Sequence, residues 1–162
     1  IRDSNHFDDK SALFDAAANE ALDEIERDVR AAQEGVDDPA LRFAIGVRVF
    51  GRAVERHPLA ARVLVTTNAW HRISDRGASP RALEDVQACL DSGEFSCADL
   101  QTTMLVIAGG ANRVLSYRLL TESAGTEVVD RSVVTCLLLF GIGTERAEQL
   151  AFAPLELDEP SA

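Results

Sequence analysis

The chain has 162 residues, of which 46% are hydrophobic, and its formal net charge at pH 7 is −11. This length and composition suit one domain with a substantial core. The charge excludes a protein that binds nucleic acid over most of its surface, because neutralisation of phosphates by Lys and Arg dominates such binding. Only residues 41–76 are basic on balance, and the segments on either side are acidic.

The first predicted helix extends from Asp9 to Gln33, with Asp8 as its N-cap. Apolar residues at positions 14, 18, 21, 25, 29 and 32 follow helical spacing. Gly35 follows the last of these positions and is expected to end the helix.

A second helix is predicted to begin at Asp38-Pro39, a pair typical of an N-cap and a first helical position. Its apolar face carries Phe43, Val47, Phe50 and Val54. A neighbouring stripe is basic and carries Arg48, Arg52 and Arg56. We expect these arginines to pair with acidic side chains of the preceding helix. Pro58 marks the end, because the residue before a proline avoids helical backbone.

Two more helices are predicted before residue 98. One starts near Leu59, and its end stays open because Thr66-Thr67-Asn68 are poor helix formers. The other begins at Ser79-Pro80 and ends at Gly93. Its inward positions are Leu83, Val86, Cys89 and Leu90.

Two long apolar helices are predicted at 98–120 and from Glu127 to about Leu150. We expect Ser96 and Asp99 to form a capping box before the first of them. Both helices are apolar over most of their circumference, yet charged residues prevent either from spanning a membrane. One face of the pair can pack on the rest of the chain, and a second copy of the chain is the simplest partner for the other face. The charged interruptions are then expected at the rim of that interface or across it: Arg113, Arg118, Asp130 and Arg131.

The C-terminal end is predicted as a last short helix, capped by Thr144, and an acidic frayed tail at 153–162. No stretch shows the alternation of a half-buried strand. The sequence therefore predicts an all-α fold, an antiparallel bundle of about six to seven helices.

No arrangement of residues indicates catalysis, so we do not expect an enzyme. A metal or cofactor is not expected either, because the three histidines have no metal-site spacing and no phosphate-cradling glycine loop occurs. Three cysteines without paired spacing, and no secretory segment, indicate reduced thiols in a cytoplasmic protein.

An apolar pocket between the helices is the alternative to a catalytic site. The residues expected to line it come from the second helix onward: Phe43, Val47, Phe50, Leu64, Trp70, Val86, Leu90, Met104 and Ala108. Polar groups that orient a ligand are expected from Asn68, His71 and Asn112. The same apolar residues could instead simply fill the core, and their spacing does not decide between the two.

Four segments resemble a known family. Residues 5–14, NHFDDKSALF, are similar to the junction of tetracycline-repressor-type (TetR family) regulators, in which a His-Phe-x-x-Lys-x-x-Leu pattern follows the recognition helix. The segments ERHPLA at 55–60, SGEF at 92–95 and LFGIG at 139–143 resemble helix corners of the same family. They occur in the family's order and cover nearly the whole chain.

This resemblance implies an effector-binding and dimerisation domain at 11–152, with a remnant of the DNA-binding domain at 1–10. About 45 residues with a helix-turn-helix would precede Ile1, and they are not in this chain. His6 and Lys10 match positions that typically touch DNA phosphates. The last two long helices would form a four-helix interface between two copies. The residues expected there are Val106, Gly110, Arg113, Val114, Tyr117, Val133, Leu137, Phe140 and Gly141.

Two functions follow from these patterns. The first is the regulatory part of a ligand-responsive repressor, which a small and largely apolar effector releases from operator DNA. The second is a dimeric helical ligand-binding module with no DNA role. An upstream helix-turn-helix would distinguish the first from the second.

Overall fold

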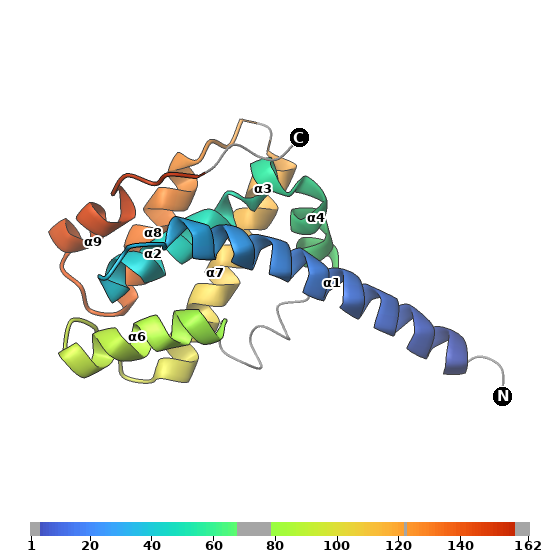
Figure 1. Ribbon diagram of the computed structural model, residues 1–162, viewed down its shortest axis with the longest axis horizontal. Coiled ribbons are helices and arrows are strands. Elements are labelled where there is room, and N and C mark those ends of the chain that lie inside the picture. Colours follow the sequence, from blue (N-terminus) through green and yellow to red (C-terminus); the bar gives the residue numbers. More distant parts are fainter. Residues whose placement is uncertain (1–3, 68–78, 122, 158–162) are drawn as a thin grey trace.

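The computed structural model describes residues 4–67, 79–121 and 123–157. This part of the chain is built from helices only and contains eight of them, which confirms the all-α prediction with a slightly higher helix number (Figure 1). The helices are α1 (Ser4–Ala32), α2 (Pro39–Gly51), α3 (Ala53–Arg56), α4 (Pro58–Thr67), α6 (Pro80–Ser92), α7 (Leu100–Leu120), α8 (Glu127–Leu139) and α9 (Thr144–Ala151). Within these residues, no helix has both the length and the apolar character needed to cross a membrane.

Helix α1 is the longest, with 29 residues, and begins at Ser4 instead of the predicted Asp9. The segment from Ser4 to Asp8 contains no Gly or Pro, so nothing in it interrupts the helix before Asp9. The far end matches the prediction closely, because Gly35 adopts a φ of 75° just after the last turn.

The predicted second helix is divided into α2 and α3 at Arg52. Asp38 caps α2 as expected, and its carboxylate accepts hydrogen bonds from the backbone N–H groups of Ala40 and Leu41. Pro58 starts α4, which places the break between helices where the proline rule predicts it. Helix α6 also has the predicted ends, with Ser79 as N-cap and Gly93 at a φ of 77°.

The capping box predicted before α7 is wrong. Asp99 alone is the N-cap and accepts from Thr102 N–H at 2.7 Å. The backbone N–H of Ser96 donates instead to the carbonyl oxygen of Phe140, at 2.8 Å, and thereby ties the loop before α7 to the end of α8. Helix α8 is shorter than predicted, because Gly141 turns the chain at a φ of 74° and α9 follows from Thr144.

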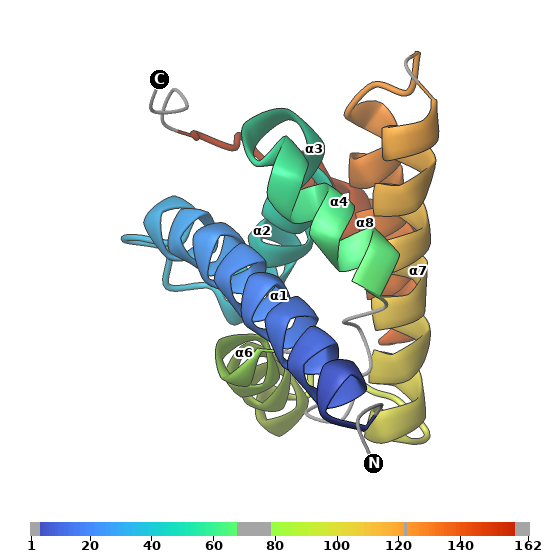
Figure 2. The same cartoon turned by 90° about the vertical axis from the view of Figure 1, so that its right-hand side faces the viewer.

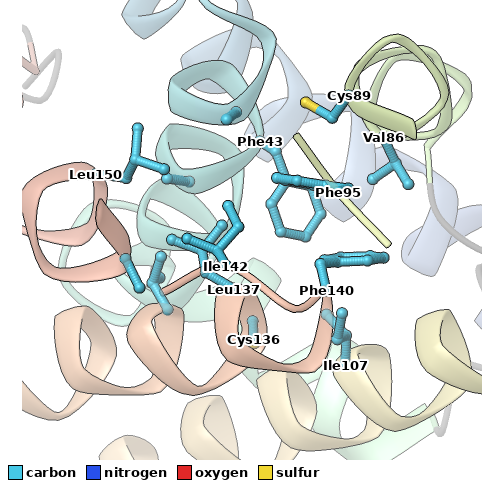
Figure 3. Packing of buried hydrophobic residues seen from close by; sticks show 14 of the residues in the cluster. Phe43, Val86, Cys89, Phe95, Ile107, Cys136, Leu137, Phe140, Ile142 and Leu150 are labelled. Atoms are coloured by element: carbon cyan, nitrogen blue, oxygen red, sulfur yellow. The ribbon is translucent and has the colours of Figure 1, made fainter. Parts of the chain in front are cut away.

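The core consists of two clusters of buried apolar residues. The first lies between α2, α6, α7, α8 and α9 and contains the aromatic trio Phe43, Phe95 and Phe140 (Figure 3). Phe95 and Phe140 stack with ring centres 4.6 Å apart, and Phe43 meets both rings edge-on. The second cluster joins α1, α3 and α4 to α2 and to Leu115 of α7.

Helix α2 is central, because it packs against α1, α6, α7, α8 and α9. Helix α7 runs along one edge of the molecule (Figure 2). The segment after α9 is more ordered than the predicted frayed tail: Leu155 and Leu157 pack on the second cluster, and the carbonyl of Ala153 accepts a hydrogen bond from Arg48. The prediction of a tail frayed from Ala153 onward is therefore wrong for residues 153–157.

Candidate ligand cavity and exposed helix face

A cavity of about 910 Å³ lies between α1, α2, the start of α6 and α7. This volume is within the range of small-molecule sites, about 300–1,000 Å³. The apolar part of its wall comes mainly from α2, with Phe43, Val47 and Phe50, and from α7, with Met104 and Ile107. The helices that line it are thus the long α1 and three of the helices that build the first core cluster, α2, α6 and α7.

Five of the residues predicted for a pocket line this cavity: Phe43, Val47, Phe50, Met104 and Ala108. Leu64 and Val86 are instead fully buried in the core, and Leu90 packs against the first cluster. None of these three is part of the cavity wall. The reason for the error is geometric, since an inward apolar residue of a helix has the same spacing whether it meets another side chain or a cavity.

The predicted polar groups, and Trp70 of the predicted apolar wall, have a different outcome. Asn68, Trp70 and His71 lie outside the described residues. Asn112 is not part of the cavity wall, and its Oδ1 atom is buried without a hydrogen-bond partner in the described part of the chain.

The polar side chains that do line the cavity were not predicted. Gln33 just after α1, Arg42 of α2 and Asp85 of α6 lie together, and Asp85 is completely buried. Gln33 Nε2 donates to the carbonyl oxygen of Arg42 at 2.7 Å, and an Arg42 Nη2 atom donates to Asp85 Oδ1. One signal in the sequence could have indicated this group: Asp85 stands one turn before the inward Cys89, so a carboxylate occupies the buried face of α6.

The other surface of α7, and the surface of α8 beside it, are apolar and uncovered. Of the ten large apolar side chains that are exposed in the described residues, six belong to these two helices: Leu105, Val106, Tyr117, Leu120, Leu138 and Leu139. Gly109 and Gly110 lie on the same side of α7, and an added Cβ at either would meet no atom within 4 Å. No other part of the described chain therefore packs closely against these two glycines, and another protein surface could approach them.

The residues predicted for a dimer interface divide between this face and the core. Val106, Gly110, Arg113 and Tyr117 are exposed, and Val114 is half-buried. Val133, Leu137 and Phe140 are completely buried in the first cluster, so their assignment to an interface is wrong. Gly141 is exposed, but its left-handed backbone faces Ser96 of the same chain.

Two of the charged residues that were expected near the interface are also buried within the fold. Arg118 is 7% exposed, donates to the carbonyl oxygen of Gly51 at 2.7 Å and pairs with Glu55. Asp130 is 9% exposed and pairs with Arg48 and Arg52. The remaining two are exposed, and Arg131 pairs with Glu127 along α8.

The three arginines of the stripe along α2 and α3 form ion pairs within the chain. Their acidic partners were predicted to lie on α1, but only one of them does. Arg56 pairs with Asp28 of α1 at 2.6 Å, whereas Arg48 and Arg52 pair with Asp130 of α8. Burial raises the pKa of Asp28, but hydrogen bonds from Arg56 and His57 outweigh that effect and hold it below its usual value. Among the described residues, no group of three or more His, Cys, Asp or Glu side chains is arranged to hold a metal ion.

These features define an all-helical domain with a cavity between its helices and one uncovered apolar helix face. Residues 38–152 match the family described as "Tetracyclin repressor-like, C-terminal domain". The match covers more than half of the chain, so the chain belongs to this family, which confirms the resemblance found in the sequence. It has the fold of a regulatory ligand-binding domain.

Two solved structures of the TetR-type regulator RolR are similar to this fold. RolR in complex with the ligand resorcinol aligns with a TM-score of 0.67 and 23% identity, over 97% of this chain and 77% of that chain. RolR without ligand aligns with a TM-score of 0.66 and 21% identity, over 93% and 78%. At this level of identity the likeness concerns the fold alone. A comparison with curated protein sequences found no match.

Proposed function

We propose that this chain is the effector-binding and dimerisation region of a TetR-family transcriptional regulator, and that a small ligand in the cavity controls binding to operator DNA. TetR-like regulators act as dimers that bind small-molecule effectors and DNA. RolR, which shares the fold, was solved with resorcinol bound. We propose no catalytic role, and we place the regulator in the cytoplasm.

One observation supports this function most directly: one side of α7 lines the cavity, and the other side carries the exposed apolar face. Met104, Ile107 and Ala108 line the cavity, while Leu105, Val106 and Gly109 alternate with them and point away from the core. A ligand that moves α7 would therefore move the surface on which we propose that a second copy packs. Since most soluble oligomers are two-fold symmetric, the same face of the partner would cover it.

Helix α1 supplies the proposed connection to DNA. Its C-terminal half lines the cavity, with Leu22, Ile25 and Val29, and its N-terminal half leads away from the bundle (Figure 1). We propose that residues 1–10 join it to a DNA-reading head and that His6 and Lys10 contact phosphates. A ligand shifts such an equilibrium only if it binds one arrangement of α1 better than the other. Small shifts suffice, because dimer half-sites lie about one DNA turn, or a multiple of it, apart.

The proposed function is tested with the regulator that contains this chain and DNA from upstream of its gene. The expected result is a gel shift that competitor DNA of unrelated sequence does not remove. A compound that binds the protein in calorimetry should then release the DNA at concentrations near its dissociation constant.

The alternative function, a dimeric ligand-binding module without a DNA role, predicts a different outcome. Ligand binding would be retained in calorimetry, and no DNA fragment would be retarded beyond the level of nonspecific DNA. That result would contradict the proposed repressor role and leave the ligand-binding role in place.

A further inference from the structure

Three polar side chains from separate parts of the chain meet at the cavity. Gln33 in the turn after α1, Arg42 of α2 and Asp85 of α6 all line it. They are linked to one another, since Gln33 Nε2 binds the Arg42 carbonyl oxygen and the Arg42 guanidinium binds Asp85 Oδ1. The group is therefore held in place by backbone and side-chain hydrogen bonds.

Each of these three side chains also keeps one polar atom unsatisfied. Gln33 Oε1, Arg42 Nε and Asp85 Oδ2 are buried and have no hydrogen-bond partner in the part of the chain that the structure describes. Asp85 is completely buried and Gln33 is 6% exposed. Buried polar groups in native proteins are nearly always hydrogen-bonded, so each such exception needs an explanation. A carboxylate oxygen without a donor is the costliest of the three, because it carries charge.

The atoms left over define what would complement them. Gln33 Oε1 and Asp85 Oδ2 are acceptors and Arg42 Nε is a donor, so the complementary ligand brings hydrogen-bond donors to the first two atoms and an acceptor to the third, as hydroxyl groups can. A ligand carboxylate would instead be repelled by Asp85. The charged residues of the cavity wall are balanced, with three acidic and three basic side chains, namely Asp23, Glu26 and Asp85 and Arg30, Arg42 and Arg81. This balance favours a ligand without net charge.

The rest of the wall selects the body of the ligand. Phe43, Val47 and Phe50 stand on one side and Met104 and Ile107 on another, so the part that does not reach Asp85 meets apolar groups. We propose that the effector is a neutral amphipathic molecule, with an apolar ring system against α2 and α7 and hydroxyl or amino donors bound by Asp85 and Gln33. This inference rests on the proposed function and specifies the ligand class of the same cavity.

The test uses matched pairs of probes that differ only in the donors. Resorcinol and 2,7-dihydroxynaphthalene are compared by calorimetry with their dimethyl ethers and with benzoate and 2-naphthoate. We expect at least one dihydroxy compound to bind at least tenfold more tightly than its dimethyl ether and than the carboxylate of the same ring size. The ethers retain the ring but have no hydrogen to donate.

Variants test whether the preference for dihydroxy compounds over their ethers depends on the two acceptors, Asp85 Oδ2 and Gln33 Oε1. Asp85→Asn should weaken the dihydroxy compound at least tenfold and leave its ether unchanged, and Gln33→Met should reduce the same preference. Glu84→Gln is the matched control, because Glu84 is the neighbouring carboxylate of α6 but is exposed and does not line the cavity, and it should keep the preference. Circular dichroism and thermal unfolding show whether each variant is folded, and Gln33→Met decides the matter if Asp85→Asn does not fold.

Several results would overturn the proposal. Equal binding of phenols and ethers, tighter binding of the carboxylates, or an undiminished preference in both Asp85→Asn and Gln33→Met would each exclude donor recognition by these atoms. Failure of every probe to bind would also reject this ligand class. In each case the proposed function is judged separately, by whether any other compound releases the regulator from DNA.

Discussion

Arg48 and Asp130 join α2 to α8 through a buried ion pair, with 2.9 Å between Nε and Oδ1. Arg52 donates to the other carboxylate oxygen, also at 2.9 Å. Asp130 thus neutralises Arg48 of α2, which lines the cavity, and Arg52 at the end of that helix. Asp130 itself belongs to α8, which carries part of the exposed face. The pair connects the two regions to which we assign ligand binding and dimerisation.

Replacing Asp130 is expected to be strongly destabilising. Asp130→Ala leaves Arg48 buried without its carboxylate, and loss of one member of a buried pair typically costs about 3–5 kcal/mol. Urea unfolding followed by circular dichroism measures the change in the free energy of unfolding. Glu127→Ala on the same helix is the control, because its pair with Arg131 is exposed and should contribute only about 0.5 kcal/mol. Equal losses for the two variants would contradict the structural role of Asp130.

Gly51 is expected to tolerate no side chain. A Cβ atom at this position would lie 2.5 Å from Val129 Cγ1 of α8, so Gly51→Ala forces α2 and α8 apart. We expect a loss of about 1–3 kcal/mol in the free energy of unfolding, typical of overpacked cores. Gly125→Ala is the control, since a Cβ there meets nothing within 4 Å, and its effect should stay within about 0.5 kcal/mol. A neutral Gly51→Ala would show that the two helices are not in close contact.

The contact between α1 and α3 is expected to weaken in acid. The pKa of Asp28 is lowered in the folded protein by its hydrogen bonds to Arg56 and His57, which outweigh the opposing effect of burial. A lowered pKa means that the ionised form stabilises the fold at neutral pH, and that this stability is lost as pH falls from about 4 through the folded-state pKa. Unfolding free energies between pH 7 and pH 2.5 should fall less steeply in Asp28→Asn than in the wild type. Parallel curves would contradict the prediction.

The three cysteines are expected to differ in reactivity. Burial raises the pKa of the Cys89 thiol to about 12 and that of Cys136 to about 11, whereas Cys97 is only half-buried. Since the thiolate is the reactive form, iodoacetamide at pH 8 should modify Cys97 first, as peptide mapping by mass spectrometry would show. In denaturant all three should react alike. Labelling of Cys89 in the native protein as fast as Cys97 would contradict its burial.

Local sequence signals located most helix ends correctly. Asp38-Pro39 and Ser79-Pro80 mark starts, and Gly93 marks an end, because caps and left-handed glycines depend only on neighbouring residues. The start of α1 and the division at Arg52 were missed. Ser4–Asp8 contains no Gly or Pro, and Arg52 makes no side-chain cap for α3, so Gly51 is the only local signal at the division.

The orientation of α8 and the polar end of the cavity could not be predicted in the same way. Helix α8 is apolar on several sides, so its sequence does not show that Leu137 faces the core while Leu138 faces outward. The pair between Arg42 and Asp85 joins residues 43 positions apart and depends on how α2 meets α6. Such arrangements arise from packing and have no local pattern.

The exposed face of α7 and α8 is the part of this account on which regulation depends, and sedimentation equilibrium tests it most directly. The wild type should have twice the mass of the chain, whereas Val106→Glu and Gly110→Glu should have the mass of one chain with unchanged helical circular dichroism. Leu13→Glu is the control, because it places the same charge at an exposed apolar residue of α1, and it should leave the mass at twice that of the chain. A single-chain mass for the wild type, or an unchanged double mass for both α7 variants, would contradict dimerisation through this face.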